Sequence, residues 1–257
     1  MNPSTEEACR ICGGPAGFTF RQRVIGHDVA YFDCPHCGYL QTQLPDWLDQ
    51  AYSRAINDVD TGILLRNRLN IGRVIMTLAA YGRLKGRVID CAGGYGILVR
   101  LLRDAGVDAR WRDKYCENLL ARGFEADDQP GDLVTAFEAF EHFVYPIEEL
   151  RAMLEQAPLV LLSTELVPGD SGPSPDWWYL GPEHGQHIGF FRARTLRWMS
   201  DRLGVHHATD GRSVHLFSRE RVPAAWHLQM SARRLWPVVA RLRLTSRTNS
   251  DFAALRR

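Results

Sequence analysis

A glycine-rich turn between an apolar strand and an amphipathic helix constrains the fold of this chain more than any other stretch. Residues 87–90 have the short apolar pattern of a buried strand, and residues 97–106 have the spacing of an amphipathic helix. Gly93, Gly94 and Gly96 form the turn between them. Glycines at such a turn let a ligand approach the backbone closely, beside the start of the helix. The unit therefore predicts an α/β fold with a ligand site at the turn.

A carboxylate at the end of the next predicted strand indicates a ligand that contains a ribose. Asp113 stands seventeen residues after Gly96, where it can accept both hydroxyls of the sugar. The spacing from Asp90 to Gly96 is Asp-x-Ala-x-Gly-x-Gly, which departs from the Gly-x-Gly-x-x-Gly of dinucleotide-binding folds. An oxidoreductase that binds a dinucleotide here is thus a disfavoured alternative. Asp90 could also do no more than cap the following helix.

Strands and helices alternate along the rest of the chain, as a parallel sheet with helical crossovers requires. The last two strands have the pattern of an antiparallel pair joined by a turn at Asp210. The further predicted strands lie within 132–143, 157–166, 204–211 and 212–220, and the further predicted helices lie at 68–82 and 146–156.

The stretch from Asp90 to Gly96 resembles motif I of the class I methyltransferases that use S-adenosylmethionine, with Ala92 where that family usually has its first glycine. The resemblance extends over roughly residues 55–218 to a bacterial branch, methyltransferase domain type 23, whose members are associated with surface-glycan and secondary-metabolite synthesis. It implies an α/β fold with a Rossmann-like, seven-stranded class I methyltransferase sheet. The stretches that carry it are 91–106, 113–124, 135–150 and 181–199.

The same resemblance implies which residues hold the cofactor S-adenosylmethionine. Asp90 is expected near its methionine end, Gly94 and Gly96 under the cofactor, and Asp113 on the ribose. The other residues expected around the cofactor are Ala92, Gly93, Lys114 and Glu138.

Four cysteines in two paired knuckles predict a structural zinc site near the N-terminus. Cys9 and Cys12 form one Cys-x-x-Cys pair, Cys34 and Cys37 form another, and a glycine follows each pair. The glycine lets the backbone turn under the metal, and four thiolates close a tetrahedral site without an open position for catalysis. Four unrelated buried cysteines or a redox pair are weaker alternatives. This ribbon also resembles that of C-methyltransferases of nucleotide sugars.

Charge is distributed unevenly in a chain whose formal net charge is +1. Residues 219–257 carry nine arginines against Glu220 and Asp251, a net of +7, which leaves −6 for residues 1–218. Residues 1–40 carry three arginines against four acids, and a tetrathiolate zinc adds about two negative charges, so the ribbon is expected to repel phosphate. We therefore expect no nucleic-acid partner. The alternative is a zinc-ribbon protein that binds RNA on a degenerate methyltransferase fold.

Residues 177–191 combine many aromatic rings with two histidines. After the fifth strand of this architecture, the chain crosses the carboxyl edge of the sheet, where ligands bind. We expect a lid over the active site that carries a general base, a role that histidine suits near neutral pH. Any single histidine could instead only satisfy a backbone carbonyl. The candidate catalytic residues are His184, His187, His142 and Glu141, and Glu138 could also orient an imidazole.

The aromatic residues of this segment have two interpretations. Trp177, Trp178 and Tyr179 could stack on a sugar face or an aromatic acceptor. They could equally form a hinge between Pro175 and Pro182.

Other polar residues have alternative roles as well. Asp58, Asp60 and Gly62 could close over the cofactor or cap a helix. Some sugar O-methyltransferases hold a divalent ion with carboxylates, but the acids here show no diagnostic cluster, so we expect no catalytic metal. The residues considered for such an ion are Glu138, Glu141, His142 and Glu165.

The sequence predicts three parts: a zinc ribbon at 1–44, a class I methyltransferase domain at 45–218 and a basic helical extension at 219–257. Arginines and apolar residues alternate at helical spacing in the extension, interrupted by Pro237. Homo-oligomer formation, an acidic-substrate site and a membrane-surface contact compete as its role. We favour packing on the domain or on a partner subunit.

The polar N-terminus and the lack of a run of eighteen apolar residues predict a soluble, cytoplasmic protein without a transmembrane segment. We expect an S-adenosylmethionine-dependent methyltransferase acting on a small acceptor, with a sugar hydroxyl in glycan or natural-product biosynthesis as the favoured class. C- or N-methylation of a nucleotide sugar or metabolite is the alternative, because one cofactor fold serves all of these reactions.

Overall fold

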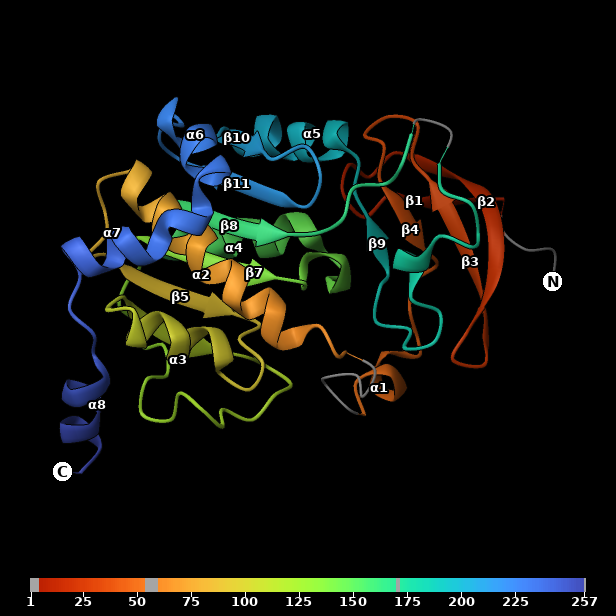
Figure 1. The fold of residues 1–257 in the computed structure, drawn as a ribbon. Coiled ribbons are helices and arrows are strands. Elements are labelled where there is room, and N and C mark those ends of the chain that lie inside the picture. The colour runs from red at the N-terminus through yellow and green to blue at the C-terminus, as the bar shows by residue number, and fades with distance from the viewer. Residues whose placement is uncertain (1–4, 54–59, 170–171, 257) are drawn as a thin grey trace. The chain divides into compact units, whose positions relative to one another are not determined.

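Figure 1 shows the computed structural model, which describes residues 5–53, 60–169 and 172–256. The chain divides into two compact units. Unit 1 consists of Met1–Ala55, Phe137–Ala152 and Leu162–Phe217, and unit 2 consists of Ile56–Ala136, Met153–Leu161 and Ser218–Arg257. The sequence-based boundaries at residues 44 and 218 stay predictions.

A six-stranded sheet carries the predicted alternation of strands and helices. Its strand order is β10-β11-β8-β7-β5-β6, and β5 pairs in parallel with both β6 and β7. The middle residues of β5 and all five of β8 are buried, as in strands covered on both faces. The expected Rossmann-like α/β class is thus confirmed. The strands are β5 (Arg87–Cys91), β6 (Asp108–Arg112), β7 (Leu133–Phe137), β8 (Leu159–Ser163), β10 (His206–Thr209) and β11 (Val214–Ser218).

The seventh strand expected from the family resemblance is reduced to a single bridge in the described part of the chain. Beside the edge strand β6, Trp111 forms an isolated parallel bridge with Glu125. The Trp111 N–H donates to Phe124 O at 2.8 Å, and the Ala126 N–H donates to Trp111 O at 2.7 Å. The residues that follow, 127–131, are Asp-Asp-Gln-Pro-Gly, which disfavour a strand because proline lacks the N–H donor. Pairing therefore stops after one bridge.

The predicted helices at 97–106 and 146–156 are confirmed, the helix predicted at 68–82 begins earlier, at Ile63, and the helix at Ala193–Leu203 was not predicted. Gly204, in the left-handed conformation, ends the helix that precedes β10. The helices are α2 (Ile63–Ala80), α3 (Ile97–Asp104), α4 (Pro146–Gln156) and α5 (Ala193–Leu203), with short helical turns α1 (Leu48–Ala51), η1 (Phe140–His142) and η2 (Trp178–Leu180).

The basic C-terminal tail forms α6 (Ala225–Ser231), η3 (Arg233–Leu235), α7 (Trp236–Arg243) and α8 (Thr248–Leu255). Within unit 2, α6, η3 and α7 pack against α2. Trp226 is fully buried, and its indole N–H donates to Thr77 Oγ1 at 3.2 Å. A Cβ at Gly72 would lie 2.6 Å from Arg233 O, so this helical glycine permits the close approach. No helix of the described chain has the length and apolarity needed to cross a membrane.

Unit 1 contains a five-stranded sheet of order β1-β2-β3-β4-β9. Its four pairings are antiparallel, and β9 comes from the aromatic segment 177–191, with Leu40 opposite Phe190. Gly189 in β9 is required, because a Cβ there would lie 1.8 Å from the Tyr39 hydroxyl. The strands are β1 (Glu6–Ala8), β2 (Pro15–Val24), β3 (His27–Asp33), β4 (Leu40–Thr42) and β9 (Gly189–Phe190).

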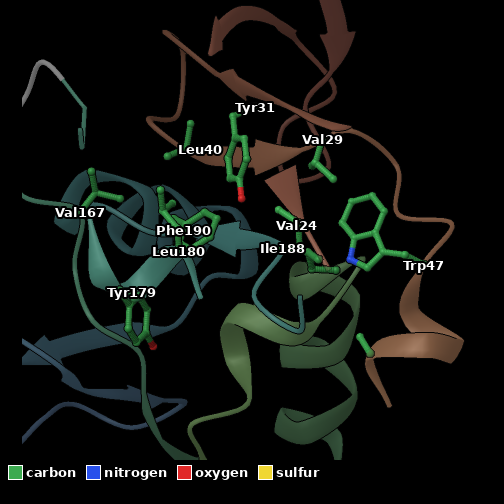
Figure 2. Close-up of a cluster of buried hydrophobic side chains, with 11 residues drawn as sticks. Val24, Val29, Tyr31, Leu40, Trp47, Val167, Tyr179, Leu180, Ile188 and Phe190 are labelled. Carbon is green, nitrogen blue, oxygen red and sulfur yellow. The ribbon is translucent and has the colours of Figure 1, made fainter. Parts of the chain in front are cut away.

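The aromatic segment 177–191 forms much of the core of unit 1. Tyr179 and Phe190 are almost fully buried, and the Trp47 indole N–H donates to Gly185 O at 2.9 Å. The segment is therefore largely a wall of the core. Figure 2 shows the cluster, which comprises Val24, Val29, Tyr31, Leu40, Trp47, Ala51, Val167, Tyr179, Leu180, Ile188 and Phe190.

Candidate active site

The loop between β5 and α3 has the conformation that its glycines predict. Gly94 and Gly96 have φ values of 53° and 84°, and Gly96 is the N-cap of α3. Ala92 also has a positive φ, 59°, a conformation that costs a residue with a Cβ about 1–2 kcal/mol. The family glycine that Ala92 replaces thus stands at a position where the backbone favours glycine.

Asp113 follows β6 and fastens this loop. Its Oδ2 accepts from the Gly94 N–H at 2.9 Å, and its Oδ1 accepts from the N–H groups of Tyr115 and Cys116 at 2.7 and 2.8 Å. Three of the roughly four lone-pair directions of the carboxylate are used in this way. The Lys114 ammonium lies over the Tyr115 ring, 5.1 Å from its centre.

Trp111 is a residue of this loop region that the sequence-based interpretation missed. Its indole N–H donates to Gly94 O at 2.8 Å. A Cβ at Gly93 would lie 2.7 Å from Trp111 Cδ1, so the indole packs directly on the glycine turn. A tryptophan two positions before Asp113 gives no periodic signal for such a contact.

Asp90 is buried on β5, with 3% of its surface exposed. Its Oδ1 accepts from the Thr135 hydroxyl at 2.6 Å. Burial raises the pKa of Asp90 to about 7, and the charge of Asp113 adds to that rise. No side chain caps α3, so the alternative that Asp90 serves as its cap is wrong.

The residues of this loop fit S-adenosylmethionine, which carries a net positive charge. In the described part of the chain, no lysine, arginine or histidine forms an ion pair with Asp90 or Asp113. A ligand with a sulfonium and an ammonium group would complement the Asp113 carboxylate and would stabilise the ionised form of Asp90.

The four knuckle cysteines meet in unit 1. The Cys9 and Cys37 sulfurs are 3.5 Å apart, the Cys12 and Cys34 sulfurs are 3.4 Å apart, and all four lie within 4.8 Å of one another. Tetrahedral zinc with bonds of about 2.3 Å places its sulfurs ~3.8 Å apart. The arrangement therefore fits a Zn²⁺ ion of the Cys₄ type.

Left-handed glycines shape the two knuckle turns. Gly13 and Gly38 have φ values of 73° and 79°. Their N–H groups donate to Cys9 O at 2.9 Å and to Cys34 O at 2.8 Å. These turns lie between β1 and β2 and between β3 and β4, as the glycine after each Cys-x-x-Cys pair predicts.

Glu141, His142 and His187 come together in unit 1, with one ligating atom of each within 4.8 Å of the others. Glu141 Oε1 lies 4.0 Å from His142 Nε2 and 3.9 Å from His187 Nε2, too far for hydrogen bonds. The Glu141 side chain is 0% exposed. Neither of its oxygens, nor His142 Nε2, has a hydrogen-bond partner within the described residues.

The backbone determines which nitrogen of His187 carries the proton. Nδ1 lies 2.5 Å from the Tyr179 carbonyl oxygen, which can only accept. Nδ1 is therefore protonated in the neutral ring, and Nε2 presents a lone pair on the side of Glu141.

His184 has the opposite arrangement. Its Nδ1 accepts from the Gln186 N–H at 3.1 Å, which leaves the proton on Nε2. That Nε2 is so close to Gly181 that a Cβ there would lie 2.1 Å from it. Although its ring centre is 4.7 Å from that of His187, His184 does not join the cluster of ligating atoms.

Burial favours the uncharged form of each group in this cluster. It raises the pKa of Glu141 to about 8, helped by the charge of Glu138 and opposed by the nearby hydroxyls of Tyr179 and Thr164. Burial also lowers the pKa of His142 to about 3 and lowers the pKa of His187 well below its ordinary value.

Glu138 lies directly after β7, with a φ of 51°. Its N–H donates to Ser163 Oγ at 2.9 Å, and the Ser163 hydroxyl donates back to its carboxylate. Ala92 stands directly after β5 with a similar positive φ. Two neighbouring parallel strands are therefore each followed by a strained non-glycine residue, a feature that is concentrated at functional sites.

The remaining candidates lie outside the Glu141 cluster. Glu165 forms an ion pair with Arg212 at 3.1 Å. Neither Glu165 nor Glu138 belongs to the cluster of ligating atoms around Glu141. Asp60 pairs with Arg66 at 2.5 Å, and Gly62 is the N-cap of α2. Asp58 lies outside the described residues. Trp178 is 69% exposed, and Trp177 is half-buried.

The family model described as a methyltransferase domain, of type 23, matches residues 65–206, more than half of the 257-residue chain. No curated protein matches the chain. One similar solved structure is 1,6-didemethyltoxoflavin-N1-methyltransferase of Burkholderia thailandensis, with 13% identity and a TM-score of 0.48 over 76% of this chain and 96% of that one. Another is a possible histamine N-methyltransferase of Thermotoga maritima, with 10% identity and a TM-score of 0.45 over 68% of this chain and 100% of that one.

An O-methyltransferase family protein of Burkholderia thailandensis has 16% identity and a TM-score of 0.41 over 59% of this chain and 55% of that one. The chain likewise spans only 62% of the protein TnmH. At such identities these likenesses concern the fold alone. The match over residues 65–206 shows that the chain belongs to the methyltransferase domain family, the enzymes that transfer the methyl group of S-adenosylmethionine.

Proposed function

We propose that the chain methylates a hydroxyl group of a small acceptor, with a sugar as the favoured class. The observation that supports this most is the convergence of Glu141, His142 and His187, where both Glu141 oxygens and His142 Nε2 lack a hydrogen bond of ordinary length within the described residues. A hydroxyl supplies one proton and two lone pairs, so it can donate to His187 Nε2 and accept from the protonated carboxyl of Glu141. Burial excludes water from the same place and strengthens each electrostatic contact.

Methyl transfer to oxygen forms a carbon–oxygen bond, breaks the carbon–sulfur bond of the sulfonium and releases the hydroxyl proton. S-adenosylmethionine, when bound, supplies an electrophilic methyl group. The Glu141, His142 and His187 cluster would hold the acceptor oxygen and draw its proton away. His187 rather than His184 belongs to this machinery, because its Nε2 lone pair is on the side of the cluster.

The loop after β5 would hold the cofactor. The main chain at Gly94 and Gly96 permits a close approach, and the remaining lone pair of Asp113 is available to a ribose hydroxyl. Asp90 would face the positive charge of the methionine end. Ala92, Gly93, Lys114 and Glu138 complete the proposed set.

An exposed aromatic ring supports a sugar acceptor. Trp178 is 69% exposed, although it is followed directly by the buried Tyr179, whose carbonyl orients His187. A large ring held in this position can stack on the apolar face of a sugar. Trp178→Ala should raise the KM for the acceptor more than it lowers kcat.

Zinc at the four cysteines is part of the same proposal. The sulfur spacing supports Zn²⁺, and all six cysteines of the chain are free thiols. Thiols of this kind persist in a reducing compartment, so we propose a cytoplasmic location.

The test is methyl transfer from isotopically labelled S-adenosylmethionine to a panel of sugar nucleotides, glycosides and catechols, with the product resolved by NMR. We expect an O-methyl product whose rate falls at least about 100-fold in Glu141→Gln, the scale of a lost general acid–base group. His207→Gln is the matched control, because His207 is a half-buried histidine of unit 1 outside the cluster. A C-methyl product, or full activity in Glu141→Gln, would contradict the proposal.

A further inference from the structure

The cluster of Glu141, His142 and His187 brings one carboxyl group and two imidazoles together, with one ligating atom of each within 4.8 Å of the others. His187 Nε2 carries no proton because Nδ1 donates to Tyr179 O, and His142 Nε2 and both Glu141 oxygens have no partner in the described chain. Burying such groups unpaired is unfavourable. A ligand that completes the site would remove this penalty.

We propose that Glu141, His142 and His187 bind a divalent first-row transition-metal ion, separate from the zinc at the four cysteines. The three side chains supply one carboxylate oxygen and two imidazole nitrogens from η1 and from the segment before β9. Ligand atoms on one ion lie at about 2.0–2.2 Å from it, hence ~3–3.5 Å from each other. The separations of 3.9 and 4.0 Å therefore need an inward shift of less than about 1 Å.

The donor set favours a particular class of ion. Imidazole nitrogens suit Zn²⁺, Cu²⁺, Fe²⁺ and Ni²⁺, whereas Mg²⁺ prefers oxygen ligands throughout. Two histidines and one carboxylate also leave coordination positions open. The Tyr179 carbonyl fixes the His187 ring through Nδ1, which is the outer-shell contact that metal-bound histidines commonly make.

The coordination positions that the three side chains leave open could hold the acceptor. This assignment of a role to the ion rests on the proposed function. Adjacent hydroxyls of a sugar can bind one ion together, and coordination lowers the pKa of a bound hydroxyl. With the ion bound, the three side chains would act as its ligands and would not accept the hydroxyl proton themselves. The ion would orient the acceptor and favour its deprotonated oxygen. The proposal departs from the sequence-based expectation of no catalytic metal, because the arrangement combines residues 141 and 142 with a histidine 45 positions later.

The test is metal stoichiometry of the full-length chain, measured by elemental analysis after saturation with Zn²⁺ and removal of free ion. We expect two zinc ions per chain in the wild type and one in both Glu141→Gln and His187→Gln. Replacement by Co²⁺ assigns the sites, because thiolate ligation gives intense charge-transfer bands that nitrogen and oxygen ligands lack. His207→Gln is the control and should keep both ions.

One zinc per wild-type chain, or an unchanged second ion in both variants, would overturn the proposal, and the cluster would then share a proton instead. Circular dichroism identifies a variant that has not folded, and the other variant then decides. Metal binding is measured without cofactor or acceptor, so two ions with no methyl transfer would refute only the proposed function. Full transfer by a chain that holds only the Cys₄ zinc would refute only the second metal.

Discussion

Two residues around the glycine loop have unusual properties that can be tested. Ala92 has a left-handed backbone conformation, and Asp90 has a buried carboxyl group. Ala92 has a φ of 59° in a loop where its neighbours Gly94 and Gly96 are also left-handed. Asp90 is a carboxyl group buried on β5 with one hydroxyl donor, Thr135. Both would be unfavourable in an ordinary strand–loop–helix connection, and both lie where the cofactor is proposed to bind.

Ala92→Gly should stabilise the folded chain by about 0.5–1 kcal/mol. Glycine removes about 1–2 kcal/mol of left-handed strain and returns part of it through the greater freedom of the unfolded chain. Ala105→Gly is the control, because Ala105 has a φ of −75° and should lose about 0.5–1 kcal/mol. Urea unfolding measures both. A destabilised Ala92→Gly would show that the methyl group has packing value that outweighs the strain.

Asp90→Asn should change how stability depends on pH. The folded pKa is about 7, above the unfolded value of about 3.9, so the contribution of Asp90 to stability is fully present below pH ~4 and is lost as the pH rises through 7. The asparagine variant lacks this loss. Its stability relative to the wild type should increase by about 2–3 kcal/mol between pH 5 and pH 8. Parallel stability curves for the two proteins would contradict the raised pKa.

At the scale of elements, two arginines connect the cysteine knuckles to the segment around β9. Arg10, between the first two cysteines, donates to Ile188 O at 2.6 Å and to Thr42 O at 2.7 Å. Arg192 donates to both oxygens of Asp33 at 3.0 and 2.6 Å and to Gly38 O at 2.7 Å. Ile188 follows His187 directly, so the cysteine knuckles support the strand next to the candidate metal ligands.

Arg192→Gln should destabilise unit 1 by about 2–3 kcal/mol and speed the release of zinc to a chelator. Arg192 is 4% exposed and Asp33 26%, so the loss approaches that of a buried ion pair, reduced for the exposure of the acid. Arg21→Ala is the control, because its pair with Asp28 is 37% and 65% exposed and should contribute less than about 1 kcal/mol. Equal effects in the two variants would argue against this link.

At the scale of the whole molecule, the tail supports the helix that follows the glycine loop. Asp251 of α8 is buried, and it accepts from Arg103 of α3 at 2.6 and 2.8 Å and from Arg100 at 2.9 Å. The Arg103 guanidinium also stacks 3.7 Å from the centre of the Phe124 ring. The contact between the tail and α3 is thus made by an acid of the tail, Asp251, and not by the arginines that give the tail its positive charge.

Asp251→Ala should lower stability by about 3 kcal/mol, because it leaves the buried Arg103 guanidinium with fewer partners. Asp104→Ala is the control, since Asp104 is 45% exposed and pairs with Arg100 at the surface. Thermal unfolding compares the two. A loss of less than about 1 kcal/mol in Asp251→Ala would show that the tail contributes little to α3.

The sequence predicts the strands and helices around the glycine loop well, because 87–91 and 97–104 have clear apolar periods. It predicts one strand too many, since the proline and acids of 127–131 outweigh the family pattern. The pairing of β4 with β9 joins residues about 150 positions apart, which no local period encodes. The choice of His187 over His184 depends on one carbonyl and one N–H, contacts that only the folded chain supplies.

The measurement that tests the central claim most directly is a calorimetric titration of the zinc-loaded chain with S-adenosylmethionine and with S-adenosylhomocysteine, beside Asp113→Ala. We predict micromolar binding of both ligands by the wild type and a loss of at least about tenfold, or ~1.4 kcal/mol, in the variant. No binding by a folded, zinc-loaded wild type would contradict a cofactor site at the loop of residues 90–96. Unchanged binding by Asp113→Ala would remove Asp113 from that site.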